Sequence, residues 1–224
     1  MLGVPSYYGG SLFIQLAAPK QMEELTVRYL KRALFETGGF ELAAGGEFND
    51  QYRDWTEPEN LNRARTFEPN LGWFFDGQAE AEGISWGGCL ESLDDLLRHG
   101  IEIPSLDEFE RIILLTETSE ELPSSGYVTR VFRALGQLGI LERVQGVLVG
   151  RPQAWNHEQP LQTEAKERYK QTQRQAILET VRKYNASVPV VQNLDFGHTN
   201  PQIAMPYGRR IRILCRTKQI LAEY

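Results

Sequence analysis

The segment Arg111 to Leu115 (RIILL) constrains the fold more than any other part of the sequence. A continuous apolar run of this length is typical of a strand that is buried on both faces, as in parallel sheets covered by helices. Gly146 to Val149 and Val188 to Val191 have the same character. Between the first two runs, Ser124 to Gly139 repeats apolar residues at helical spacing after a serine that can cap a helix. This alternation predicts a mixed α/β fold.

The remaining regular elements follow from periodicity and from glycine stops. We expect an antiparallel hairpin at the C-terminus, so the sheet is not expected to be purely parallel. The predicted elements are a helix over Met22 to Phe35, a strand over Phe40 to Ala43, a short helix opened by Gly87 to Leu90, a long polar helix over Glu164 to Tyr184, and hairpin strands over Arg209 to Leu214 and Gln219 to Tyr224.

Two stretches have little regular pattern. Gly45 to Gly83 is rich in turn-forming residues and contains Trp55 and Trp73. A loop this long is uncommon in a compact domain and is often functional, although two core tryptophans pinning a surface loop would also explain it. Met1 to Phe13 is aromatic and glycine-rich. It resembles the interior of a domain, or else it is a packed N-terminal arm.

Composition excludes several classes of protein. The chain has 224 residues, of which 41% are hydrophobic, and a net charge of −6. This acidic balance argues against nucleic-acid binding, which needs a basic face. Two cysteines are too few for a disulfide framework and indicate a reducing compartment. No apolar run approaches the roughly 18 residues that span a bilayer, and the start lacks the pattern of a secretory signal. We therefore expect a soluble, cytoplasmic protein.

Among the three histidines, His198 has the sequence context of a functional residue. It lies in Asn193 to Pro201 (NLDFGHTNP), after the predicted strand Val188 to Val191. In α/β folds, residues just beyond the carboxyl ends of strands line the usual site. Gly197 lets the backbone turn tightly beside it. The other two histidines are expected at a helix C-terminus and in a polar loop (His99 and His157).

A carboxylate follows the buried strand at Arg111 to Leu115. Glu117 lies where that strand leaves the core. A carboxylate in this place can accept a hydrogen bond from an imidazole and stabilise the imidazolium that forms during proton transfer. Glu120 and Glu121 are expected near the N-terminus of the next helix, where negative charge is favourable. The alternative interpretation gives Glu117 the same helix-stabilising role.

No serine has the context of a nucleophile elbow, because none combines a preceding strand, a glycine turn and a following helix. Cys89 opens a predicted helix, where a thiolate would be favoured, but a small buried apolar role is the alternative. No His or Cys pair has the spacing of metal ligands, and no glycine-rich phosphate loop occurs.

Four motifs, in order along the chain, resemble the LD-carboxypeptidase family of serine peptidases. The likeness is greatest to its microcin-immunity branch and extends from Val4 to Tyr224. The motifs are GISWGGCLESL (Gly83 to Leu93), ILLTETSEE (Ile113 to Glu121), GILERVQGVLVGRP (Gly139 to Pro152) and NLDFGHTNPQIAMPYG (Asn193 to Gly208).

The resemblance implies a Ser–Glu–His triad shared between two domains. In the family, a flavodoxin-like N-terminal domain bears the serine on a G-x-S-D-x-T elbow. A C-terminal domain, a swivelling β/β/α sandwich, supplies the other two residues. Glu117 in TETSEE and His198 in FGHTNP match the family's glutamate and histidine. In the microcin-immunity branch, a loop tryptophan stacks on an aromatic part of the substrate. Trp55 in RDWTEP is the nearer match, with Trp73 as second choice.

The chain departs from the family pattern at its start. It begins almost on the PSYYGGSL segment, which lies downstream of the serine elbow in the family. The nucleophile and its oxyanion-binding N–H groups are therefore expected to be missing. We expect residues 1–36 to be a remnant of the N-terminal domain with its linker, and residues 37–224 to be the C-terminal domain. Gly-Gly-Cys at Gly87 to Cys89 also replaces the Gly-Gly-Asn of many relatives.

Two functions follow as expectations. The resemblance implies a serine carboxypeptidase that hydrolyses an amide near a free carboxylate, in an LD-linked cell-wall peptide or a peptidyl-nucleotide toxin, without metal or organic cofactor. The alternative is a catalytically inactive fragment or pseudoenzyme that only binds or dimerises. Residues 1–35 are expected to expose an apolar patch, and we expect a homodimer, with neither nucleic acid nor membrane as a partner.

Overall fold

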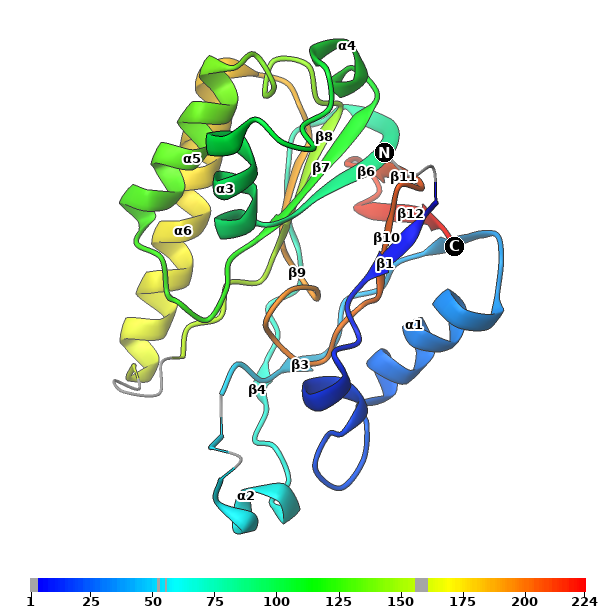
Figure 1. Cartoon of the computed structure of the whole chain (residues 1–224), viewed down its shortest axis with the longest axis vertical. Coiled ribbons are helices and arrows are strands. Elements are labelled where there is room, and N and C mark those ends of the chain that lie inside the picture. Colours follow the sequence, from blue (N-terminus) through cyan, green and yellow to red (C-terminus); the bar gives the residue numbers. More distant parts are fainter. Residues whose placement is uncertain (1–3, 52, 55, 156–160) are drawn as a thin grey trace.

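The structure, a computed structural model, describes residues 4–51, 53–54, 56–155 and 161–224. An eight-stranded mixed sheet runs through it (Figure 1), with the strand order β2-β12-β11-β6-β7-β8-β9-β5. The four central strands are parallel to one another and the strands on both flanks are antiparallel. The central strands are β6 (Glu80–Cys89), β7 (Ile112–Glu117), β8 (Gly146–Gly150) and β9 (Val190–Leu194), and the flanking strands are β2 (Gly39–Glu41), β5 (Phe74–Asp76), β11 (Arg210–Leu214) and β12 (Gln219–Glu223).

Helices cover both faces of this sheet. Three lie together on one face and a fourth lies near the opposite face (Figure 1). The three are α3 (Leu90–His99), α5 (Ser125–Gln137) and α6 (Thr163–Tyr184), and the fourth is α1 (Glu24–Phe35). Shorter elements are β1 (Ser6–Tyr8), the π-helix η1 (Leu12–Leu16), β3 (Glu47–Phe48), α2 (Pro58–Asn62), β4 (Glu68–Pro69), α4 (Leu106–Phe109) and β10 (Met205–Tyr207).

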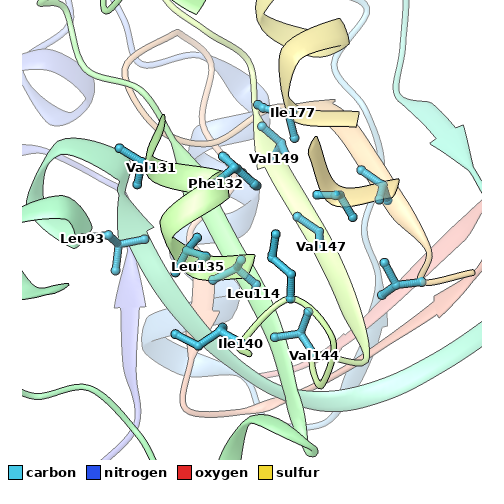
Figure 2. Close-up of a cluster of buried hydrophobic side chains, with 14 of the residues drawn as sticks. Leu93, Leu114, Val131, Phe132, Leu135, Ile140, Val144, Val147, Val149 and Ile177 are labelled. Atoms are coloured by element: carbon cyan, nitrogen blue, oxygen red, sulfur yellow. The ribbon is translucent and has the colours of Figure 1, made fainter. Parts of the chain in front are cut away.

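Each central strand divides its side chains between two cores, because successive residues of a strand point to opposite faces. Leu114, Val147 and Val149 pack with the helices α3, α5 and α6 (Figure 2). Ile113 and Leu148 pack on the other face with Tyr29 of α1 and the C-terminal hairpin. The apolar run therefore forms a strand buried on both faces, as predicted.

Most predicted elements are confirmed within a few residues. The helix α5 begins after Ser124, whose hydroxyl accepts a hydrogen bond from the Tyr127 N–H as expected of a cap. The terminal hairpin is present as β11 and β12, paired antiparallel. The long helix α6 matches its prediction in extent, but it buries Lys166, Lys170 and Gln173 as well as apolar residues.

Two boundaries were predicted wrongly. Gly87, Gly88 and Cys89 do not open a helix but end the strand β6, and α3 begins only at Leu90. The reason is close packing, because a Cβ on Gly87 would overlap the Leu115 carbonyl of the neighbouring strand. The strand expected to stop at Val191 continues to Leu194, since its polar end also pairs with β8 and β5.

Among its described residues, the irregular stretch over residues 45–83 contains only short elements (β3, α2, β4, β5) before β6 begins at Glu80. The N-terminal segment joins the C-terminal half, because β1 pairs antiparallel with β10. Tyr7 also stacks on Tyr224 with ring centroids 5.5 Å apart. The division of the chain at residue 36 stays a prediction. Among the described helices, none combines the length and apolar character that crossing a membrane requires.

Gly136 and Gly126 on α5 form a matched pair for testing the contact between α5 and α6. A Cβ on Gly136 would overlap the Tyr184 ring, whereas one on Gly126 would meet its nearest atoms at 3.7 Å. We expect Gly136→Ala to lower the free energy of unfolding by about 1–3 kcal/mol through overpacking. Gly126→Ala should raise it by about 0.4–1 kcal/mol by restricting the unfolded chain. Urea denaturation measures both, and equal effects would contradict the close contact.

Candidate active site

The carboxyl ends of the parallel strands meet at one edge of the sheet. Cys89 at the end of β6 lies opposite Glu117 at the end of β7. Gly150 ends β8, and the loop that follows β9 carries His198. Strands of one direction bring their ends to the same edge, so residues far apart in the sequence become neighbours.

Glu117 and His198 are in direct contact at this edge. The His198 Nδ1 lies 2.7 Å from Glu117 Oε2, and the Glu117 side chain is fully buried. The other carboxylate oxygen, Oε1, accepts a hydrogen bond of 2.6 Å from the Tyr8 hydroxyl. Burial, followed by the charge of Glu117 and the hydrogen bond to it, raises the pKa of Tyr8, so the phenol stays protonated and donates. Both oxygens of the buried carboxylate are thus satisfied.

Two glycines make room for this contact. Gly197 has φ +98°, and a Cβ there would overlap Glu117 Oε2. A Cβ on Gly150 would press on Glu117 Cβ and on the Phe196 carbonyl oxygen. Gly197 is therefore required both by its left-handed backbone and by the close approach of the carboxylate.

The His198 imidazole is surrounded by acidic groups. Burial disfavours its charged form, but the hydrogen bond to Glu117 and the charges of Glu117, Glu120 and Glu91 outweigh burial and raise the pKa of His198. Glu120 Oε2 lies 3.2 Å from the His198 Nε2. The sequence-based expectation placed Glu120 near the N-terminus of the next helix, α5, which begins at Ser125. The Glu120 side chain is 63% exposed, and this contact is with the histidine.

A cleft of about 850 Å³ opens beside His198. This volume is within the range of small-molecule sites in proteins, about 300–1,000 Å³. The side of the cleft at the histidine carries Tyr8, Glu120 and Gln202. The irregular stretch contributes further lining residues, among them Asp50, Gln51, Arg53, Asn60, Leu61 and Arg65. The long loop is therefore part of the cleft wall.

A buried ion pair supports the loop that carries His198. Arg151 Nη2 lies 2.6 Å from Asp195 Oδ1, and both side chains are almost fully buried. Arg151 Nη1 also donates to Thr199 Oγ1 at 3.3 Å. The Asp195 carboxylate accepts further hydrogen bonds from the Gly45 N–H and from Trp73 Nε1. Residues on both sides of His198 are thereby fixed to β8 and to the irregular stretch.

A second buried charge fixes the cleft wall to α6. Lys166 Nζ lies 2.7 Å from Asp50 Oδ1, and it also contacts Glu68 of β4. Asp50 Oδ2 accepts a hydrogen bond from the Ala154 N–H at 3.2 Å. Burial lowers the pKa of Lys166, but its hydrogen bonds to Asp50 and Glu68 outweigh burial, so the pKa is raised and the ammonium form is favoured.

The structure places the other sequence candidates in different surroundings. Trp73 donates to Asp195 at 2.9 Å and packs against the core rather than lining the cleft. Trp55 and His157 lie outside the described residues. His99 ends α3 with its Nδ1 2.7 Å from the Asp95 carbonyl oxygen.

Cys89 does not have the surroundings of a nucleophile. Its thiol donates to Glu91 Oε2 over 3.2 Å. Burial, the charge of Glu117 and this hydrogen bond raise the pKa of Cys89 to about 12, so the thiol is protonated at neutral pH. In the part of the chain that the structure describes, no three His, Cys, Asp or Glu side chains come together as metal ligands do.

Three contributors to the site were missed from the sequence. Tyr8 lies 109 positions before Glu117, and no local pattern links the two. Arg151 and Asp195 each follow a buried strand directly, and Glu117 is the last residue of a buried strand. That shared position was the available signal for the ion pair, and it was used only for Glu117 and His198.

The raised pKa of His198 has a testable origin. Because the folded chain binds the imidazolium more tightly, His198 stabilises the fold below the ordinary pKa of 6.5, and this stabilisation is lost as the pH rises through the raised value. Glu117→Gln keeps the shape but removes the charge, so we expect a lower pKa of His198 by NMR titration. Glu121→Gln, the control, should leave that pKa unchanged. An unshifted pKa in Glu117→Gln would contradict the assignment.

The Arg151–Asp195 pair should matter far more for stability than an exposed ion pair. Arg151→Met leaves a buried carboxylate without its counter-charge, and we expect the free energy of unfolding to fall by about 3–5 kcal/mol. Arg210→Met removes an arginine whose side chain is 53% exposed beside Glu82, with an expected loss of about 0–1 kcal/mol. Chemical denaturation compares the two variants, and similar losses would refute the supporting role of Arg151.

Comparison with known proteins identifies the family. A family model of the LD-carboxypeptidase C-terminal domain matches residues 82–213. A carboxypeptidase homologue of Bacillus subtilis is 29% identical over 92% of this chain and 56% of its own length. The chain spans about half the length of the curated relatives that it matches.

Solved structures share the fold. An MccF-like protein from Streptococcus pneumoniae, in complex with AMP, superposes with a TM-score of 0.82 and 26% identity, over 100% of this chain and 64% of that one. The microcin C7 self immunity protein MccF, in complex with aspartyl sulfamoyl adenosine, has a TM-score of 0.78 and 20% identity over 99% of this chain and 62% of that one. Because the family model spans more than half of its residues, the chain belongs to the LD-carboxypeptidase family, of which it contains the C-terminal domain.

Proposed function

We propose that Glu117 and His198 are the acid–base pair of a serine carboxypeptidase-type amide hydrolase, and that a segment outside these 224 residues supplies the nucleophilic serine. The observation that carries the proposal is the contact of 2.7 Å between His198 Nδ1 and the buried Glu117 carboxylate. A carboxylate that holds Nδ1–H leaves Nε2 as the base, which is the division of roles in a Ser–His–acid triad.

The chemistry of the pair follows from this arrangement. The His198 Nε2 accepts the proton of the serine hydroxyl as its oxygen attacks the amide carbonyl carbon. Glu117 stabilises the imidazolium, which then gives its proton to the amide nitrogen as the C–N bond breaks. A water molecule next attacks the acyl-enzyme by the same route. Among the described residues, none of the contacts of His198 involves a serine hydroxyl.

Glu120 must leave Nε2 before the serine can use it. The contact of 3.2 Å between Glu120 Oε2 and Nε2 forms a hydrogen bond only when the imidazole is protonated at that nitrogen. Because the Glu120 side chain is 63% exposed, it can turn into solvent at little cost. The His198 Nε2 is then free to act as a base toward the cleft.

The substrate that we propose is a peptidyl compound with a free carboxylate, either an LD-linked cell-wall peptide or a peptidyl-nucleotide. The binding of AMP by the S. pneumoniae protein supports the nucleotide alternative. Trp55 is proposed to stack on an aromatic part of the substrate, since its near neighbour Arg53 lines the cleft. Trp73 is the second choice, and its hydrogen bond to Asp195 already gives it a structural role.

The test of the pair uses this chain joined to a serine-bearing N-terminal domain, with hydrolysis of a peptidyl amide as the readout. We expect His198→Ala and Glu117→Ala each to lower kcat by about 10⁴-fold or more, as removal of a triad member does. His99→Ala, which changes an exposed histidine at the end of α3, is the control and should keep full activity. Full activity in His198→Ala would refute the proposal.

A fluorophosphonate probe separates this proposal from the alternative that the chain is an inactive binding module. The joined protein should be labelled on its serine, and the 224-residue chain alone should not. Labelling of the chain alone would show that it contains its own nucleophile. Absence of labelling in every joined protein that folds would favour the binding module.

A further inference from the structure

A second, much smaller cavity lies next to Glu117, between the strand ends and the helices α5 and α6. Its volume is about 10 Å³. It is lined by Thr116, Glu117 and Thr118 of the β7 end, by Gln173 of α6 and by Gln192 of β9, among others. Neither His198 nor Tyr8 lines it, so it is distinct from the cleft.

Three polar side chains on the wall of this cavity have an unused hydrogen-bonding atom. Thr116 Oγ1, Gln173 Oε1 and Gln192 Oε1 have no partner among the described residues. These side chains are deeply buried, with exposed fractions of 1%, 1% and 4% respectively. A buried polar atom without a partner costs about 1–3 kcal/mol. Three such atoms on one small cavity are therefore unexpected unless something in it bonds them.

The orientation of both glutamine amides is fixed from outside the cavity. Gln173 Nε2 donates to the Pro123 carbonyl oxygen at 2.5 Å, and Gln192 Nε2 donates to the Arg174 carbonyl oxygen at 3.2 Å. The free atom of each side chain is therefore its acceptor oxygen. Tyr169 gives its hydroxyl proton to the same Pro123 oxygen, at 3.1 Å, and its own oxygen accepts hydrogen bonds from the Thr118 and Gln173 side chains, which leaves Gln173 Oε1 unused.

The size and the polarity of the cavity fit one small molecule. A cavity needs about 10–15 Å³, and two to four polar partners, to hold a water. Water donates two hydrogen bonds and accepts two, which complements two amide oxygens and the Thr116 hydroxyl. We propose that this cavity holds one ordered water molecule that hydrogen-bonds Thr116, Gln173 and Gln192.

Such a water would join three elements behind the active-site pair. Thr116 belongs to β7, Gln173 to α6 and Gln192 to β9, the strand that leads to His198. Thr116 directly precedes Glu117 in the chain, so the water would hold the backbone that presents this carboxylate. The inference does not depend on the proposed hydrolase activity, and its tests use no activity readout.

The direct test is a crystal structure of the 224-residue chain at a resolution that shows ordered waters. We expect density for one water within hydrogen-bond distance of Thr116 Oγ1, Gln173 Oε1 and Gln192 Oε1. A cavity without density in a well-ordered structure would overturn the proposal. So would a rearrangement in which these atoms bond one another directly.

A substitution at Thr116 should change the stability of the fold in opposite directions, depending on whether the cavity holds a water or is empty. If Thr116 bonds a water, Thr116→Val removes one hydrogen bond, and the folded-to-unfolded ratio should fall about fivefold. If the cavity is dry, the same change removes an unsatisfied hydroxyl and the ratio should stay constant or rise. Thr172→Val is the control, because Thr172 is exposed and its hydroxyl donates to the Tyr169 carbonyl oxygen. A constant or raised ratio in Thr116→Val would overturn the proposal.

A separate NMR measurement tests whether the Thr116 hydroxyl helps to position Glu117. Thr116→Ser keeps the hydroxyl, so it should preserve the NMR signal of the His198 N–H that is bonded to Glu117, whereas Thr116→Val should shift that signal. Equal spectra for the serine and valine variants would show that the hydroxyl does not act on the pair.

Discussion

The edge of the sheet is organised around the cost of burying the Glu117 carboxylate. An ionised group in the interior is tolerated only when it is fully hydrogen-bonded. The Tyr8 hydroxyl and the His198 imidazole meet that demand, one on each oxygen. Gly197 and Gly150 provide the space, because a Cβ on Gly197 would overlap the carboxylate and one on Gly150 would overlap Glu117 Cβ and the Phe196 carbonyl oxygen. The N-terminal segment, β7, β8 and the loop after β9 are thus tied to a single acidic group.

Two further carboxylates are also buried, and each is paired with a cationic side chain. Asp195, three residues before His198, is buried against Arg151, and Asp50 of the cleft wall is buried against Lys166. A buried ion pair adds little net stability over apolar packing, but it is costly to separate. The Arg151–Asp195 pair therefore holds the loop after β9 against the end of β8, and the Asp50–Lys166 pair holds the cleft wall against α6. The cleft has walls of defined position although much of its lining lies outside regular elements.

Sequence reasoning succeeded where the signal was local. The apolar runs predicted the central strands β7, β8 and β9, and the serine before α5 predicted its first turn. The fourth central strand, β6, was not predicted. It failed where packing between distant segments decides the outcome. Gly87 to Cys89 were expected to begin a helix, yet Gly87 lies against the Leu115 carbonyl in a strand. The burial of Lys166 could not be predicted either, because its partner Asp50 is 116 positions away.

The sequence alone determined the class of fold, the family resemblance and the placement of Glu117 and His198 near the carboxyl ends of two strands. These properties depend on periodicity and on short motifs, which are local. Only the tertiary structure decided that the two residues touch, that Tyr8 completes the carboxylate's hydrogen bonds and that Glu120 faces the imidazole. It also showed that Trp73 donates a hydrogen bond to Asp195. The physical reason is that such contacts join segments whose separation along the chain leaves no periodic or compositional trace.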